Sequence, residues 1–137
     1  MSVGGHSCAR LDAGNVRCWG YNAYGQRGQG HTNNLGDNPA ELPVLDIAVG
    51  ASALQVEAGG SHTCALIDTG AVRCWGSNNY GELGYAGFGG KTKPDGKDVV
   101  GIAGVVQIAL GNAHTCALLD DGTVRCWGFN SNGELGL

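Results

Sequence analysis

The chain has 137 residues, of which 26 are glycine and 15% are charged, and glycine spread through a whole chain favours short strands joined by tight turns. The net charge of −4 and the lack of a basic cluster argue against nucleic acid as a partner. No apolar run approaches the roughly 20 residues of a membrane span, and the first residues lack the basic and apolar regions of a signal peptide, so we expect no membrane association.

One sequence pattern occurs three times along the chain. Its copies read GGHSCARLDAGNVRCWGYNAYG at residues 4–25, GSHTCALIDTGAVRCWGSNNYG at 60–81 and NAHTCALLDDGTVRCWGFNSNG at 112–133. The second and third copies continue into Glu-Leu-Gly, whereas the first continues into Gln-Arg-Gly. Such repetition indicates an array of equivalent structural units. We expect a single array of three repeats, at about residues 1–45, 46–101 and 102–137.

Each copy predicts a β-hairpin, and the second shows the reasoning. Cys64 and Cys74 are centred on Thr69, so an odd number of residues closes the turn, and the loop 68–70 fits with Gly70 in the left-handed position. Only glycine adopts that conformation without strain. We therefore expect a structural role for the glycines that end the three loops, Gly14, Gly70 and Gly122.

An alternating apolar segment precedes the second and third copies, at residues 54–59 and 106–111, and alternation is the period of a strand. The first copy has no such segment before His6. The third copy stops just where a further connection would begin.

Counting back from the turn pairs Ile67 with Ala71 and Cys64 with Cys74. If the pair next to the loop is hydrogen-bonded, the cysteines fall at a non-hydrogen-bonded site, where opposed Cα atoms are about 4.5 Å apart and a disulfide can form. The predicted pairs are Cys8–Cys18, Cys64–Cys74 and Cys116–Cys126. Disulfides would imply an oxidising, extracytoplasmic or secreted location. The alternative is six reduced cysteines packed as small apolar residues.

The repeated histidines and tryptophans are candidates for chemistry. His62 with Cys64 and Cys74 offers ligand types for zinc, but the cysteines are not spaced as the close pairs of structural zinc sites. A residue present in every repeat is more simply structural: hydrogen bonding for His6, His62 and His114, and core packing for Trp19, Trp75 and Trp127. No Gly-x-Ser-x-Gly nucleophile motif occurs. We expect no catalytic residues, no metal and no cofactor, and hence a protein that is not an enzyme.

The pattern Gly-x-x-His-Thr-Cys-Ala-Leu-x-x-Asp-Gly-x-Val-x-Cys-Trp-Gly-x-Asn-x-x-Gly-Glu-Leu-Gly closely resembles the RCC1 repeat (regulator of chromosome condensation). The nearest form is the bacterial, cysteine-paired type of large surface proteins, and residues 30–39 resemble the connection between repeats in that type. The resemblance covers essentially the whole chain. It implies an all-β fold of RCC1-like β-propeller blades, each with four strands and commonly about seven to a ring.

Three repeats would supply one complete blade and two partial ones, which leaves the ring incomplete in one chain. Sheet faces and strand edges exposed at both ends of such an arc favour association. Two interpretations stay open: a fragment of a longer protein, or a chain that closes a ring by forming a homo-oligomer.

Binding residues are expected where the copies differ, because the repeating positions build the blade and the connections line its faces. The candidates after each Trp-Gly are Tyr21, Tyr24, Asn79, Tyr80, Phe129 and Asn130. Aromatic side chains mixed with Asn, Ser and Gly suit a protein-binding loop, although ordinary turns have a similar composition.

The function expected is that of a non-catalytic scaffold that binds a protein or another ligand. The alternatives are a structural or adhesive repeat segment of a larger surface protein and, on the resemblance alone, an enzyme inhibitor of the β-lactamase-inhibitor type. Relatives of this fold also include an exchange factor for a small GTPase and a photoreceptor, so the fold does not fix the function.

Overall fold

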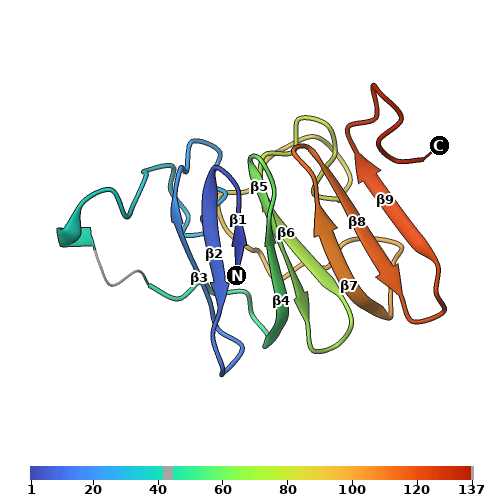
Figure 1. The fold of residues 1–137 in the computed structure, drawn as a ribbon, viewed down its shortest axis with the longest axis horizontal. Coiled ribbons are helices and arrows are strands. Elements are labelled where there is room, and N and C mark those ends of the chain that lie inside the picture. Colours follow the sequence, from blue (N-terminus) through green and yellow to red (C-terminus); the bar gives the residue numbers. More distant parts are fainter. Residues whose placement is uncertain (42–44, 137) are drawn as a thin grey trace.

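A computed structural model of the protein describes residues 1–41 and 45–136 and shows three antiparallel sheets of three strands each (Figure 1). The first sheet contains β1 (Ser2–Val3), β2 (His6–Arg10) and β3 (Val16–Gly20). The second contains β4 (Ala53–Ala58), β5 (His62–Ile67) and β6 (Val72–Gly76). The third contains β7 (Val105–Leu110), β8 (His114–Leu119) and β9 (Val124–Gly128). A single 3₁₀ turn, η1 (Pro39–Glu41), is the one helical element of the described ranges, and no helix there is long and apolar enough to cross a membrane.

The hairpin register predicted from the cysteine spacing is confirmed in all three sheets. In the second sheet the Gly70 N–H donates to the Ile67 carbonyl at 2.9 Å, and Gly70 has φ +79°. The Ile67 N–H donates to Ala71 at 3.0 Å, so Cys64 and Cys74 face each other at a non-hydrogen-bonded pair. The three cysteine pairs form disulfides, with Cα–Cα distances of 4.2, 4.1 and 4.1 Å.

The strand count differs from the expectation in two ways. First, the chain has a strand before His6: the two residues of β1 pair with β2, although they are too few to show an alternating pattern. Second, each described sheet has three regular strands rather than four. Among the described residues, irregular chain takes the fourth position beside β3 and forms backbone bridges to it at two points, Leu35 with Gly20 and Ile47 with Val16. Beside β6, Lys91 and Val99 do the same. Segments this rich in glycine and proline do not form the continuous backbone hydrogen bonds of a regular strand.

The alternating segments form strands as predicted, but each contains a β-bulge. Ala53 pairs with Ile67 and Gln55 pairs with Leu66, which leaves Leu54 as the extra residue. Val106 is the extra residue in β7. The bulge turns these two apolar side chains away from the core, and they are 53% and 54% exposed.

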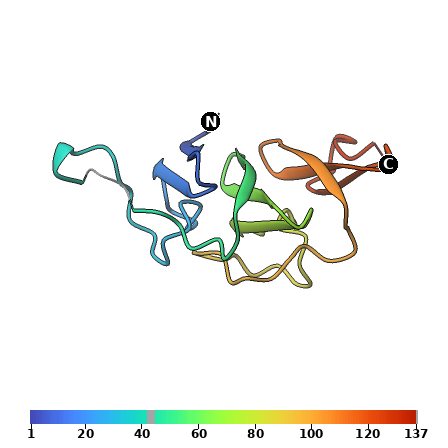
Figure 2. The same ribbon diagram turned by 90° about the horizontal axis from the view of Figure 1, so that it is seen from below.

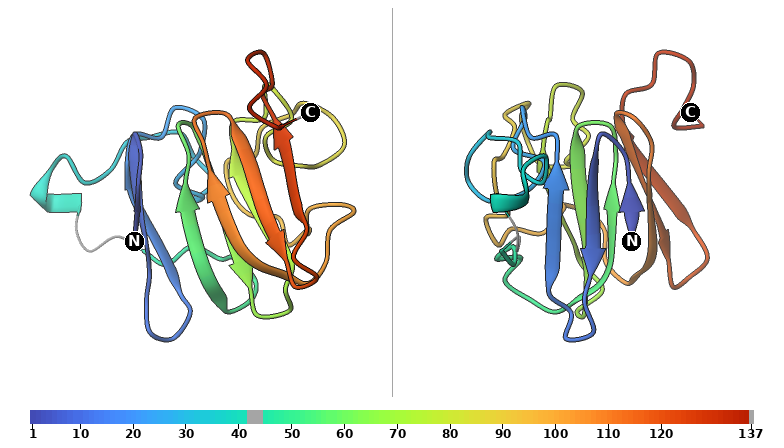
Figure 3. Two further views of the ribbon diagram at one scale, coloured as in Figure 1. Left: turned by 45° about the vertical axis from the view of Figure 1, so that its right-hand side comes forward. Right: turned by 60° about the vertical axis from the view of Figure 1, so that its left-hand side comes forward.

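The three sheets stand side by side in chain order, with neighbouring sheets packed face to face (Figures 2 and 3). Two apolar cores fill the spaces between them. One joins the first and second sheets, and includes Val16, Ile67 and Trp75. The other joins the second and third sheets, and includes Val72 and Ile108. Each sheet therefore folds against its neighbours rather than around a core of its own.

Removing the central disulfide by the double substitution Cys64→Ala/Cys74→Ala should lower the free energy of unfolding by about 3 kcal/mol, measured by urea denaturation. The chain-entropy model gives about 2–3 kcal/mol for so short a loop, and the loss of two buried sulfur atoms adds a packing cost. Cys116→Ala/Cys126→Ala is the matched control, because that pair closes a loop of equal length but is half-buried. An unchanged wild-type midpoint after addition of a reductant would show that the cysteines stabilise as packed thiols instead.

Candidate functional site

The connections that follow β3, β6 and β9 leave the same side of the three sheets, opposite the hairpin turns (Figures 1 and 3). These are the segments after each Trp-Gly, and they carry a series of aromatic side chains. Tyr21, Tyr24, Tyr80 and Phe88 are 45%, 45%, 53% and 73% exposed, and Phe129 is half-buried. We call these five residues the aromatic side. Exposed aromatic residues gathered on one side of a molecule are typical of a binding surface.

Two of these rings connect neighbouring repeats. Tyr80, from the connection after β6, and Phe129, from the connection after β9, pack edge to face with ring centroids 4.9 Å apart and an interplanar angle of 76°. Such pairs contribute about 0.5–1.5 kcal/mol of stabilisation beyond that from the apolar area they bury. Because each ring limits the movement of the other, the pair presents a fixed apolar surface rather than two mobile side chains.

A buried asparagine holds the connections after β3 and β6 in shape. The Asn78 side chain donates from Nδ2 to the carbonyl of Gly87 at 2.9 Å, and its Oδ1 accepts the Leu83 N–H at 2.9 Å. Asn22 makes the same type of contacts in the first repeat and is fully buried. No role was predicted for Asn22, although an asparagine recurs at that position in all three copies.

The two asparagines proposed as binding residues behave differently. Asn79 is exposed beside Tyr80. Asn130 occupies the position of Asn22 and Asn78, and its Oδ1 accepts the Leu135 N–H at 2.9 Å, which gives it the same loop-shaping bond. Partner binding by either asparagine stays a prediction.

A second set of contacts orients the tyrosines. The Tyr80 N–H donates to the Glu82 carboxylate at 2.8 Å, and the Tyr24 N–H donates to the Gln26 side chain at 2.9 Å. Glu82 and Gln26 are themselves buried. Buried side chains therefore hold the backbone that carries the exposed rings, and this reduces the conformational entropy lost when a partner binds.

The repeated histidine, hydroxyl and tryptophan side chains form a hydrogen-bond relay between sheets. The Thr63 hydroxyl donates to the Gln26 carbonyl at 2.6 Å, and Trp75 Nε1–H donates to the same oxygen at 2.9 Å. His6 Nε2 lies 2.6 Å from the Thr63 hydroxyl oxygen. We call this set of bonds the relay.

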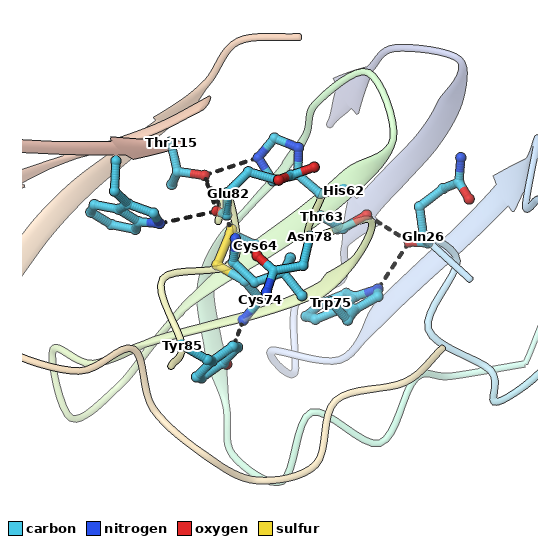
Figure 4. The surroundings of a disulfide bond; sticks show 12 residues. Gln26, His62, Thr63, Cys64, Cys74, Trp75, Asn78, Glu82, Tyr85 and Thr115 are labelled. Atoms are coloured by element: carbon cyan, nitrogen blue, oxygen red, sulfur yellow. Dashed lines mark hydrogen bonds between the residues drawn. A yellow bond between two sulfur atoms is a disulfide. The ribbon is translucent and has the colours of Figure 1, made fainter. Parts of the chain in front are cut away.

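The relay recurs between the second and third sheets, around the central disulfide (Figure 4). His62 Nε2 lies 2.9 Å from Thr115 Oγ1, and both Thr115 and Trp127 donate to the Glu82 carbonyl, at 2.9 and 3.0 Å. Hydrogen bonding by the repeated histidines was expected, but the rest of the relay was not foreseen, because its acceptors are main-chain oxygens that carry no sequence signal. A hydroxyl residue follows the repeated histidine in every copy, at Ser7, Thr63 and Thr115, and this recurrence could have indicated a structural hydrogen bond.

The relay fixes the protonation of the buried histidines. Each threonine gives its only hydroxyl hydrogen to a carbonyl, so His6 and His62 must donate from Nε2. Their Nδ1 atoms are buried without a hydrogen-bond partner among the described residues. Burial lowers the pKa of both histidines to about 4, and nearby His6 and His114 also lower the pKa of His62. Both are therefore neutral at pH 7, and they join sheets rather than face solvent.

Comparison with known proteins agrees with this architecture. The family model "Regulator of chromosome condensation (RCC1) repeat" matches residues 3–26, 54–82 and 105–134, and a second model of the same description matches residues 69–118. The chain is 36% identical over 131 residues to the human (Homo sapiens) probable E3 ubiquitin-protein ligase HERC4, covering 96% of this chain and 12% of that protein. It is 36% identical over 137 residues to human HERC3, covering 99% and 13%. The chain thus spans about an eighth of the length of these curated relatives.

Solved structures show the same fold. Prp20p of Saccharomyces cerevisiae superposes with a TM-score of 0.77 at 28% identity, over 99% of this chain and 33% of that chain. Human WBSCR16 superposes with a TM-score of 0.75 at 24% identity, over 93% and 32%. Sequence models and structural neighbours agree across the repeats, and this chain belongs to the regulator of chromosome condensation (RCC1) repeat family.

Proposed function

We propose that this chain is a non-catalytic β-propeller scaffold that binds a protein partner through the aromatic side. The observation that carries the proposal is the gathering of Tyr21, Tyr24, Tyr80, Phe88 and Phe129 on connections that leave one side of three packed sheets. Tyrosine and phenylalanine on anchored backbone supply large contact areas at little entropic cost.

Relatives support a protein partner. Prp20p was solved together with a study of its binding to Gsp1p and histones, and yeast RCC1 (Prp20) has been solved bound to Kap60. These partners belong to those proteins. What we carry over is the class of function: a protein of this fold that binds another protein.

The three disulfides support a location where thiols are oxidised, outside the cytoplasm or secreted. In such a compartment the disulfides would also stabilise a binding scaffold that has no large core.

Panning a phage-displayed random peptide library on the immobilised chain tests the proposal. Binding hot spots are enriched in tyrosine, so the enriched peptides should lose about tenfold or more in affinity for Tyr80→Ala, measured by biolayer interferometry. Leu54→Ala is the matched control: Leu54 is equally exposed at 53% but lies on the bulge of β4. We expect its affinity for the same peptides to equal that of the wild type.

Three results would contradict the proposal. Unchanged affinity for Tyr80→Ala would mean that the peptides bind elsewhere, and equal loss for both variants would mean that the loss is not specific to the aromatic side. A failure to enrich any peptide would favour a structural repeat segment that needs no specific ligand.

A further inference from the structure

The two faces of each sheet carry different residues, and the second sheet shows both faces in use. Thr63, Ala65 and Trp75 face the first sheet, where they are fully buried. We call residues at these positions the hydroxyl face. On the other side, the residues that face the third sheet are His62, Cys64, Leu66, Val72 and Cys74. We call residues at these positions the histidine face.

At each internal interface, the earlier sheet in the chain supplies the histidine face and the later sheet supplies the hydroxyl face. His6 in the first sheet meets Thr63 in the second, and His62 in the second sheet meets Thr115 in the third. The same two-sided contact therefore occurs twice, with the same relay and the same packing of a tryptophan.

The third sheet has a histidine face that no described residue covers. Val124 is 61% exposed, whereas Val16 and Val72 at the same position are 0% exposed. Cys116 and Leu118 are half-buried, and with Val124 they line a shallow apolar hollow of about 210 Å³. His114 holds the position of His6 and His62 but has no threonine opposite it in the described part of the chain.

The first sheet has the complementary hydroxyl face, and it too is uncovered by the residues described. Ser7, Ala9 and Trp19 are half-buried, whereas Thr63, Ala65 and Trp75 at the same positions are 0% exposed. Ser7 supplies a hydroxyl and Trp19 an indole N–H, which are the two donors that the relay uses.

We propose that copies of this chain associate head to tail, with the histidine face of the third sheet in one copy packed on the hydroxyl face of the first sheet in the next. Ser7 and Trp19 would donate to the carbonyl of Glu134, which holds the repeat position of Gln26 and Glu82. His114 would donate to Ser7. The occupant is a second copy, because each chain carries both halves of an interface that it already forms twice within itself.

Contact between two different faces is heterologous, so it generates closed rings of two or more copies, or open chains, rather than a dimer in which like faces meet. The faces involved contain none of the residues of the aromatic side. The association and the proposed partner binding can therefore fail independently.

Two single substitutions test the association, and each blocks one face. Val124→Asp places a carboxylate on the histidine face, and Ala9→Asp does the same on the hydroxyl face. We expect the wild-type chain to form species larger than its 13.9 kDa monomer in analytical ultracentrifugation, and each variant alone to be monomeric. A mixture of the two variants should form a 1:1 dimer and stop there, because one intact histidine face and one intact hydroxyl face remain.

Folding is checked by urea denaturation of each variant, and both substituted positions are already partly exposed, so we expect folded monomers. Trp19→Phe is a milder test, because it keeps an aromatic ring and removes the N–H donor together with the five-membered ring. The loss of one hydrogen bond should raise the dissociation constant about fivefold.

A wild-type chain that stays monomeric at all accessible concentrations would overturn the proposal. So would a self-associating Val124→Asp or Ala9→Asp variant, because the contact would then join like faces. A mixture of the two folded variants that remains monomeric would also overturn it.

Discussion

Trp75→Ala should lower the free energy of unfolding by about 3–5 kcal/mol, the range for removing a buried aromatic side chain. The Trp75 side chain is 0% exposed, lies in the core between the first and second sheets, and donates from Nε1 to the Gln26 carbonyl. Its removal leaves a cavity where two repeats join, and Gly28 beside the ring has no side chain to fill the space. Urea denaturation followed by circular dichroism measures the loss.

The matched control is Trp127→Ala, which changes the same residue of the next repeat. Trp127 makes the same hydrogen bond, to Glu82, but is half-buried. We therefore expect a smaller loss than for Trp75. Trp75→Phe keeps an aromatic ring but removes the N–H donor and the five-membered ring, so it should cost more than the about 1 kcal/mol of one hydrogen bond and less than Trp75→Ala. Equal losses for the two alanine variants would show that the depth of burial of the tryptophan does not decide its contribution to stability.

Acid should destabilise the protein between pH 6.5 and pH 4. His6 and His62 have a folded pKa of about 4, lowered from 6.5 chiefly by burial. The unfolded chain takes up protons first as the pH falls, so stability that is fully present above pH 6.5 is lost as the pH falls towards 4. A shift of this size corresponds to about 3 kcal/mol for each histidine. We expect the urea midpoint to fall steeply across this range.

The double variant His6→Gln/His62→Gln is the control for the acid effect. It is expected to be less stable than the wild type at pH 7 but to lose much less stability between pH 7 and pH 4. Hydrogen bonds lower the pKa of Asp46 and Asp121 in the folded chain, so the stability that these two carboxylates contribute is lost mainly below this pH range. A wild-type midpoint that stays constant from pH 7 to pH 4 would mean that the histidines are solvated in solution.

Local geometry accounts for what could be predicted from the sequence. A hairpin closed by a three-residue loop ending in Gly70 has only one register, and that register places Cys64 opposite Cys74. The repeat pattern therefore determined the hairpins, the cysteine pairs and the all-β class. It also indicated which connections carry the exposed aromatic residues, because positions that differ between copies are not needed to build the sheet.

Contacts between sheets decided what the sequence could not show. Val72 and Val124 occupy the same position in identical Val-Arg-Cys-Trp-Gly strands, yet one is 0% and the other 61% exposed. Leu54 belongs to an alternating pattern but is turned outward by a bulge. The sequence by itself determined the repeating unit, because pairing within a hairpin depends on near neighbours. Burial, the histidine pKa values and the relay acceptors were decided only by the tertiary structure, because they depend on which sheet lies opposite.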